Sequence, residues 1–282
     1  MKKINITAIL ACAGFAILAP SAKAALSSYT AGDFLLGFRQ TGATYSYVVD
    51  LGQTLSQNIL NGSGFTLQLS QTDLNTVLGS TFGGSTWSSA SSYWSLGATS
   101  GAGGALGLNP KELIVSKNET TLGVQSTPWT IPANNNAGNT TLTNLSNAAG
   151  GFNNTTLAAA SGMSAGLGLQ AIQQTAANTY AWNKFSPVGT SGGSFSEFTG
   201  GTGVEGSFTS GAAGTVLDLY LVDSPLNGVV SQGASSTYLG KMTLDNNAQL
   251  NFIAAVPEPS SFGLIAVGLL AFAGFNRRRQ LA

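Results

Sequence analysis

Residues 215–222 read TVLDLYLV, and together with YLGKMTL at 238–244 and QLNFI at 249–253 they decide the fold. In the first stretch Val216, Asp218 and Tyr220 share one face and three leucines share the other, which is the period of a half-buried strand. The segment Asp-Asn-Asn at 245–247 is typical of a tight hairpin turn. The sequence therefore predicts a strand followed by a β-hairpin close to the C-terminus.

Further segments upstream also have the composition of strands, bounded by Gly, Asn and Ser. They are residues 34–39, 44–51, 65–69, 92–98 and 112–117. A short helix is expected at 72–78 and a longer one at 169–185, while 118–165 and 189–203 are rich in Asn, Gly, Thr and Ser and are predicted to be loops. We expect a mainly β body, a sandwich or jelly roll with long loops and one or two short helices.

The N-terminus has the pattern of a secretory signal peptide. Two lysines precede an apolar run, which is cleanest over residues 8–19, and the small-x-small triplet of Ala22 and Ala24 follows. Cleavage after Ala24 makes residues 1–24 the signal peptide. A retained anchor is the alternative, but the run is shorter than the ~20 residues of a membrane-spanning helix. Cys12 gives a faint likeness to a lipoprotein processing site.

The C-terminus has three parts in a fixed order. Residues 256–261 read VPEPSS, residues 262–275 are apolar, and Arg277, Arg278 and Arg279 follow. The prolines favour an extended, accessible segment, and the apolar run predicts a C-terminal membrane helix. The arginines act as a stop on the cytoplasmic side, which places the body outside the cytoplasm. The run is short and contains three glycines, so it suits a temporary anchor.

This tail resembles the PEP-CTERM sorting signal of Gram-negative bacteria. The resemblance implies recognition of Pro257, Glu258 and Pro259 by an exosortase, a membrane protease-transpeptidase that removes the tail and passes the protein to the cell surface or matrix. It divides the chain into a body at 25–255 and a sorting tail at 256–282. An ordinary C-terminal anchor remains the alternative. The segments 32–39 and 92–97 and the final hairpin are also similar to PEP-CTERM proteins of unassigned function.

The predicted body is poor in charge. It keeps five Lys and Arg against ten Asp and Glu, a net charge of about −5. Nucleic-acid binding depends on clustered cations that displace phosphate counterions, and the sequence has no such cluster in the body. Nucleic acid is therefore excluded as a partner.

The composition also argues against an enzyme. The chain has no histidine, and its single cysteine, Cys12, lies in the signal peptide, so we predict no metal site, no cofactor and no catalytic residue. Acid pairs for glycoside hydrolysis remain open, with Asp218 and Asp223 or Glu197 and Glu205 as candidates. The Gly-rich stretch 101–107 lacks the lysine of a phosphate loop and is expected to be flexible. The 245–247 segment is expected to be a turn rather than a calcium site.

Aromatic side chains offer a further possibility, because sugar rings stack on them. Trp129 lies between two prolines on a predicted loop and is the best candidate for an exposed glycan contact; Trp87, Tyr93, Trp94 and Trp182 are alternatives that more often belong to a core. We therefore predict an exported surface or matrix protein with a structural or adhesive role. Its expected partners are signal peptidase and the export machinery, an exosortase, exopolysaccharide and, transiently, the inner membrane. A carbohydrate-binding adhesin and a tail-anchored hydrolase are the alternatives.

Overall fold

The computed structural model describes residues 29–40, 45–72, 74–75, 87–88, 92–100, 104–106, 112–129, 145–151, 170–175, 182, 203–208, 216–222 and 236–255. The predicted signal peptide, the membrane segment 262–275 and most of the predicted loop 189–203 lie outside them. Within the described residues no helix is long and apolar enough to cross a membrane.

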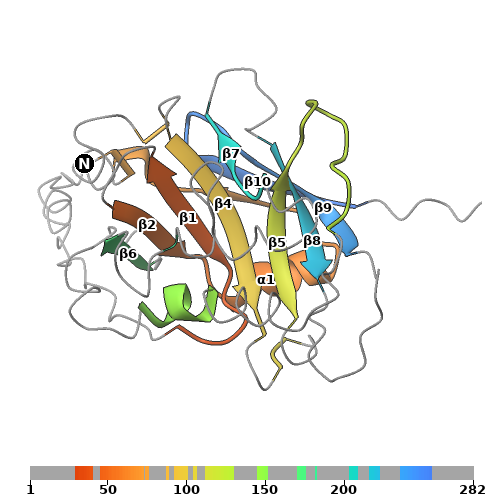
Figure 1. Ribbon diagram of the computed structural model, residues 1–282, viewed down its shortest axis with the longest axis horizontal. Coiled ribbons are helices and arrows are strands. Elements are labelled where there is room, and N and C mark those ends of the chain that lie inside the picture. Colours follow the sequence, from red (N-terminus) through yellow and green to blue (C-terminus); the bar gives the residue numbers. More distant parts are fainter. Residues whose placement is uncertain are drawn as a thin grey trace, which may run out of the picture.

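The body is built on one antiparallel sheet (Figure 1). Its strands are β1 Leu35–Gln40, β2 Tyr45–Asp50, β3 Phe65–Gln68, β4 Ser92–Thr99, β5 Leu113–Asn118, β6 Gln170–Thr175, β7 Gly206–Ser207, β8 Val216–Val222, β9 Thr237–Leu244 and β10 Gln249–Ala254. They follow the order β3-β10-β9-β8-β5-β4-β1-β2-β6, and β7 pairs with β4. All eight strands predicted from the sequence are confirmed within one or two residues of their predicted ends.

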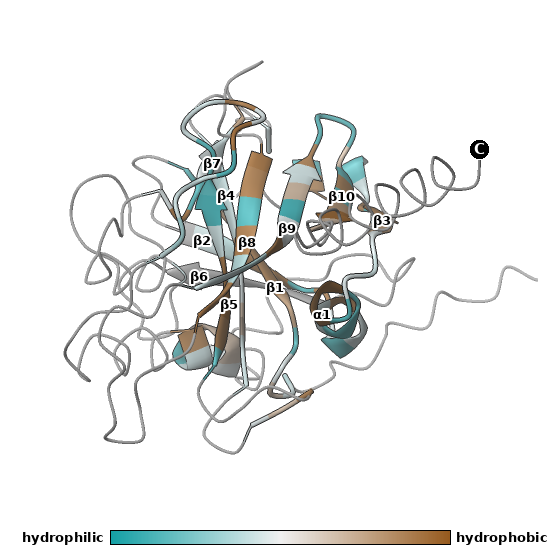
Figure 2. Cartoon of the chain, turned by 90° about the vertical axis from the view of Figure 1, so that its right-hand side faces the viewer, coloured by the Kyte–Doolittle hydropathy of each residue, from teal (hydrophilic) through white to brown (hydrophobic). Residues whose placement is uncertain are grey.

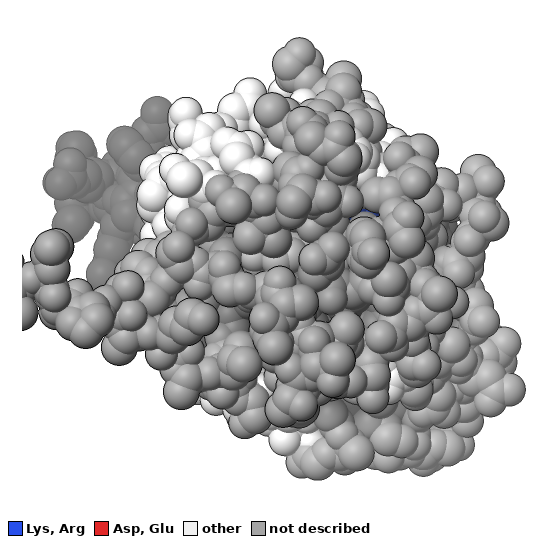
Figure 3. Space-filling model, turned by 90° about the vertical axis from the view of Figure 1, so that its left-hand side faces the viewer, with Lys and Arg blue, Asp and Glu red and all other residues white. Residues whose placement is uncertain are grey.

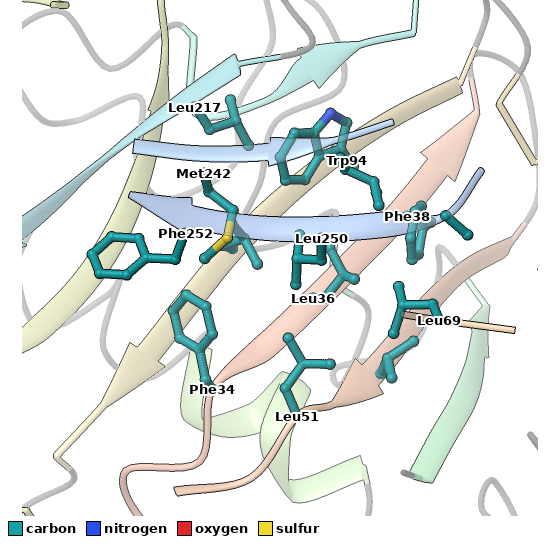
Figure 4. Packing of buried hydrophobic residues seen from close by; sticks show 14 of the residues in the cluster. Phe34, Leu36, Phe38, Leu51, Leu69, Trp94, Leu217, Met242, Leu250 and Phe252 are labelled. Atoms are coloured by element: carbon teal, nitrogen blue, oxygen red, sulfur yellow. The ribbon is translucent and has the colours of Figure 1, made fainter. Parts of the chain in front are cut away.

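One face of the curved sheet packs on a large hydrophobic core. Its buried side chains alternate along the strands, as period-two patterning requires, and they meet between distant parts of the sequence (Figure 4). The labelled members are Phe34, Leu36, Phe38, Leu51, Leu69, Trp94, Leu217, Met242, Leu250 and Phe252. The last hairpin thus packs against β1 and β4, which come from the other end of the chain.

The opposite face of the central strands is also covered. A second cluster joins Leu35, Val48, Val115 and Tyr220 to residues of covering segments, among them Trp129, Trp182 and the helix at 145–150. Consequently every residue of β1 is buried, and the middle strands β1 and β8 are predominantly hydrophobic in Figure 2.

The sandwich or jelly-roll prediction is corrected by this topology. All described strands join one sheet that curls into a half-barrel, instead of forming two stacked sheets. The alternation of side chains identifies strands and their faces, but not which strands pair with one another. The hydrophobic side chains that cover the second face of the sheet come from loops and a short helix.

The predicted helix at 169–185 is wrong at its start. Residues Gln170–Thr175 form β6, which pairs with β2 along its whole length from Tyr45↔Thr175 to Asp50↔Gln170. Helix propensity is a weak preference, and six cross-strand pairs outweigh it. Conversely, α1 Gln53–Leu60 was not predicted; it buries Ser56 and Ile59. The helix expected at 72–78 is described only as helical turns at residues 71–72 and 74–75.

Candidate functional site: the sorting tail and its root

The sorting tail leaves the body at the end of the last strand. β10 ends at Ala254, and the next N–H, that of Ala255, still donates a hydrogen bond of 3.0 Å to the carbonyl of Leu239. β10 is paired on both sides, with β9 and with β3. The chain is therefore held in the sheet until two residues before Pro257.

A glycine allows this close approach of the strands. Gly240 on β9 has φ 141°, and a Cβ added there would lie 2.4 Å from the carbonyl oxygen of Ile253. Any larger residue would push β10 away at the point where the tail begins. Residues 253–255, here called the tail root, thus lie in close backbone contact with Gly240 of β9.

The tail root lies at the same end of the sheet as the start of β1. Antiparallel pairing carries the C-terminal end of β10 to the N-terminal end of β9, and on through β8, β5 and β4 to Leu35. The turn at 245–248 lies at the opposite end, where β9 passes into β10. Both chain ends that the sequence predicts to engage the membrane during export therefore leave from one end of the body.

Comparison with known proteins identifies the tail. Residues 255–279 match the PEP-CTERM protein-sorting motif. The matched residues begin at the residue after β10 and include Pro257, Glu258, Pro259 and Arg277–Arg279, whose structure lies outside the described residues. A search of curated proteins and a search of solved structures each found no match.

The chain therefore carries a PEP-CTERM protein-sorting motif at its C-terminal end. Such a motif implies export and processing by a membrane-associated exosortase that directs the protein to the cell surface. The motif covers 255–279 alone, and it says nothing of the body that precedes it.

Glu205 and Asp218 are the two described acids among those considered for hydrolysis, and both make buried contacts inside the fold. Glu205 binds Arg39 through both carboxylate oxygens, and the two side chains are 7% and 4% exposed. The guanidinium of Arg39 also lies 4.7 Å from the ring centre of Tyr93. Glu205 is therefore committed to a buried ion pair, while its proposed partner Glu197 lies outside the described residues.

Asp218 is wholly buried on the face of β8 that packs against the second hydrophobic cluster. One carboxylate oxygen accepts a 2.5 Å hydrogen bond from the N–H of Ser126, and its cross-strand neighbours are Lys117 on β5 and Lys241 on β9. Burial lowers the pKa of Lys117, and the charge of Asp218 partly opposes that shift. Asp223, the other member of the predicted pair, lies outside the described residues. Of each predicted acid pair, the structure therefore describes one member only.

Trp129 is not the exposed glycan contact that the sequence predicted. Its side chain is 0% exposed, and the ammonium nitrogen of Lys117 lies 4.0 Å from the centre of its ring. The backbone N–H of Trp129 donates to the hydroxyl of Ser236, which ties the segment onto the sheet. The flanking prolines mark an extended segment, but they carry no information on what the ring covers.

The other candidate aromatic residues are also mainly core. Trp87, Trp94 and Trp182 are at most 1% exposed, and Tyr93 lies under Arg39. The turn predicted at 245–247 is confirmed, with Asp245 Oδ1 accepting from the N–H groups of Asn247 and Gln249. Among the described residues no cluster of three or more potential metal ligands occurs. The Gly-rich stretch 101–107 is described only at 104–106.

A buried carboxyl pair, which was not predicted from the sequence, lies at the start of β1. Asp33 and Asp50 are 7% and 6% exposed, and their side chains are hydrogen-bonded to each other. Asp33 Oδ2 also accepts from the N–H of Thr30, and Asp50 Oδ1 from that of Gly52. Only the β1–β2 register, which pairs Leu35 with Asp50, brings these distant acids together.

This pair makes folding sensitive to pH. Burial, and then the neighbouring Asp33, raise the pKa of Asp50 from 3.8 to about 7, and burial also raises the pKa of Asp33. The protonated form of Asp50 is therefore favoured in the folded state. Its stabilising contribution is complete below pH ~4 and is lost as the pH rises through about 7.

Asp50→Asn is expected to remove this pH dependence. The amide keeps an acceptor for the N–H of Gly52 and carries no charge. We expect equal stability of variant and wild type near pH 4, and a variant more stable by about 1–2 kcal/mol at pH 8. A pKa difference of about three would give at most roughly 4 kcal/mol, and sharing of the proton with Asp33 reduces it. Urea unfolding at the two pH values measures this. If variant and wild type differed in unfolding free energy by the same amount at pH 4 and at pH 8, the proton shared by Asp50 and Asp33 would be contradicted.

Proposed function

We propose that this chain is an exported cell-surface or extracellular-matrix protein without enzymatic activity, sorted through its C-terminal tail. A signal peptide at 1–24 starts export. The segment 262–275 holds the body transiently in the inner membrane, and an exosortase recognises Pro257, Glu258 and Pro259. The released body, residues 25 to about 255, then has a structural or adhesive role with exopolysaccharide.

The proposal rests on the observation that the sorting motif begins directly where the folded sheet ends. The PEP-CTERM match starts at residue 255, and the last strand ends at Ala254. Pro257 is only two residues beyond Ala255, a distance of about 7 Å even when the chain is fully extended. The motif is therefore presented beside a rigid sheet end, and cleavage there would remove no part of the described fold.

A passive role of the body is supported by its chemistry. The described acids considered for hydrolysis, Glu205 and Asp218, are buried and hydrogen-bonded. The small part of the surface in Figure 3 that belongs to described residues is almost entirely uncharged. A body that stays in solution through hydroxyl and amide groups suits contact with uncharged, hydroxyl-rich polymers.

The proposal is tested by the intact mass and cell fraction of the protein from its producing bacterium. We expect a mature form that starts at Ala25, ends near Pro257 and is found outside the inner membrane. Pro257→Ala combined with Pro259→Ala should leave most of the protein full-length at its C-terminus and in the inner membrane. Pro128→Ala, a proline change in the body, is the matched control and should be processed normally.

A retained tail in the wild-type protein, indifferent to both proline changes, would overturn the sorting proposal. The chain would then be an ordinary anchored envelope protein.

A further inference from the structure

A shallow, uncharged hollow lies on the sheet just before the tail. It has a volume of about 570 Å³ and is lined by Gly64, Phe65, Thr66, Thr243, Asn251, Phe252 and Ile253. These residues come from β3, β10 and β9, which lie together in Figure 2. The volume falls within the usual range of small-molecule sites, roughly 300–1,000 Å³.

Polar groups of three neighbouring strands form one row across this hollow. Thr66 pairs with Asn251, and Asn251 pairs with Thr243, so their side chains share a face. The hydroxyl of Thr66 donates to Asn251 Oδ1 at 2.7 Å, which holds the amide in a fixed orientation. Among the residues that the structure describes, the hydroxyl of Thr243 makes no hydrogen bond. The row therefore offers hydroxyl and amide groups that can both donate and accept.

Apolar surface lies beside this row. Ile253 is 53% exposed, unusual for a β-branched residue on a paired strand, and it shares the face of Asn251. The rings of Phe65 and Phe252, which pair across β3 and β10, pack on each other on the core side of the sheet with centroids 5.6 Å apart, and support the strands that carry the row. Gly64 also lines the hollow and has no side chain to fill it. A Cβ there would lie 3.1 Å from the carbonyl oxygen of Phe252, a tight contact.

We propose that this hollow binds a neutral sugar unit of an extracellular polysaccharide. A pyranose ring has hydroxyl groups at its edge and C–H groups on its faces, and the hollow offers the complement of each. Thr66, Thr243 and Asn251 bind the hydroxyl groups, while Ile253 covers an apolar face. No charged side chain lines the hollow, and Lys241, which pairs with Ile253 beside it, also pairs with Asp218 of opposite charge, so a neutral sugar fits better than an acidic one.

This inference rests on the proposed function and replaces Trp129 as the glycan contact. Ile253 lies two residues before the start of the sorting motif, so the tail root borders the site. The site belongs to the body that remains after processing.

The test compares two double variants in affinity gel electrophoresis. Thr66→Val with Asn251→Leu removes both partners of one hydrogen bond by nearly isosteric changes, which costs little stability. Gln57→Leu with Thr121→Val makes the same kinds of change at exposed positions outside the hollow. The proteins are purified from producing cells in the form in which they occur, with detergent if membrane-bound. The gels contain hydroxyethylcellulose, dextran, galactomannan, alginate or the bacterium's own exopolysaccharide.

We expect at least one neutral polysaccharide or the native exopolysaccharide to retard the wild type and the control. The hollow variant should bind at least about tenfold more weakly, with an unchanged unfolding curve. Equal retardation of both variants, retardation by alginate alone, or none in any gel would overturn the inference. Sorting is scored separately by mass and fraction, so normal processing without glycan binding rejects this site and leaves the proposed function standing.

Discussion

Gly37→Ala is expected to be among the most destabilising single substitutions in the body. Gly37 lies in β1, and a Cβ there would lie 2.1 Å from both Cε2 and Nε1 of Trp182. The indole cannot move away easily, because its Nε1 donates a 2.8 Å hydrogen bond to Ser95 Oγ and the ring is fully buried. A methyl group forced into this contact should cost about 3 kcal/mol or more. Urea unfolding monitored by tryptophan fluorescence measures the loss.

Two controls keep this prediction testable. Gly62→Ala meets no atom within 4 Å and is strained only by its φ of +66°, so it should cost about 1 kcal/mol. Gly37→Ala combined with Trp182→Leu removes the clash and should be more stable than Gly37→Ala alone. If Gly37→Ala is no worse than Gly62→Ala, the packing of Trp182 on β1 is wrong.

Glu205→Gln is expected to have a comparable effect. It leaves the guanidinium of Arg39, which is 4% exposed in its side chain, without its carboxylate. Removal of one partner of a buried ion pair typically costs about 3–5 kcal/mol, because the remaining charge has lost both water and counter-charge. The loss would be seen as a lower midpoint of urea unfolding.

The double variant Arg39→Met with Glu205→Leu separates a buried charge from lost packing. Both charges are absent, so it should be clearly more stable than Glu205→Gln alone. A double variant that is as unstable as the single one would contradict this explanation. The same experiment bears on catalysis, because a folded double variant allows any hydrolytic role of Glu205 to be measured directly.

Local patterning predicted most of the strands. The stretch 215–222 became β8 because its leucines alternate with residues of the other face, and 245–247 became a turn because Asp245 bonds its own backbone neighbours. Local patterning failed at 170–175, where the residues lack strong β preference and only pairing with β2 makes them a strand. Long-range pairing of this kind leaves no trace within a short window of sequence.

The candidate sites show the same division. The sorting tail is recognisable from sequence because Pro-Glu-Pro, an apolar run and arginines act through their order along the chain. The hollow at Thr66, Thr243 and Asn251 was not predicted, since its residues are ordinary polar side chains until β3, β10 and β9 pair. The pair of Asp33 and Asp50 was missed for the same reason, and Trp129 was misplaced because exposure depends on what other segments cover.

By itself, then, the sequence determined the mainly β character of the body and the sorting tail, because both depend on contacts or recognition within a few consecutive residues. Only the tertiary structure decided that the strands form one curled sheet, that Glu205 neutralises Arg39 inside the protein, and that the tail starts beside an uncharged hollow. These features depend on which distant strands become neighbours, and that choice minimises exposed apolar surface and unpaired polar groups over the whole chain at once.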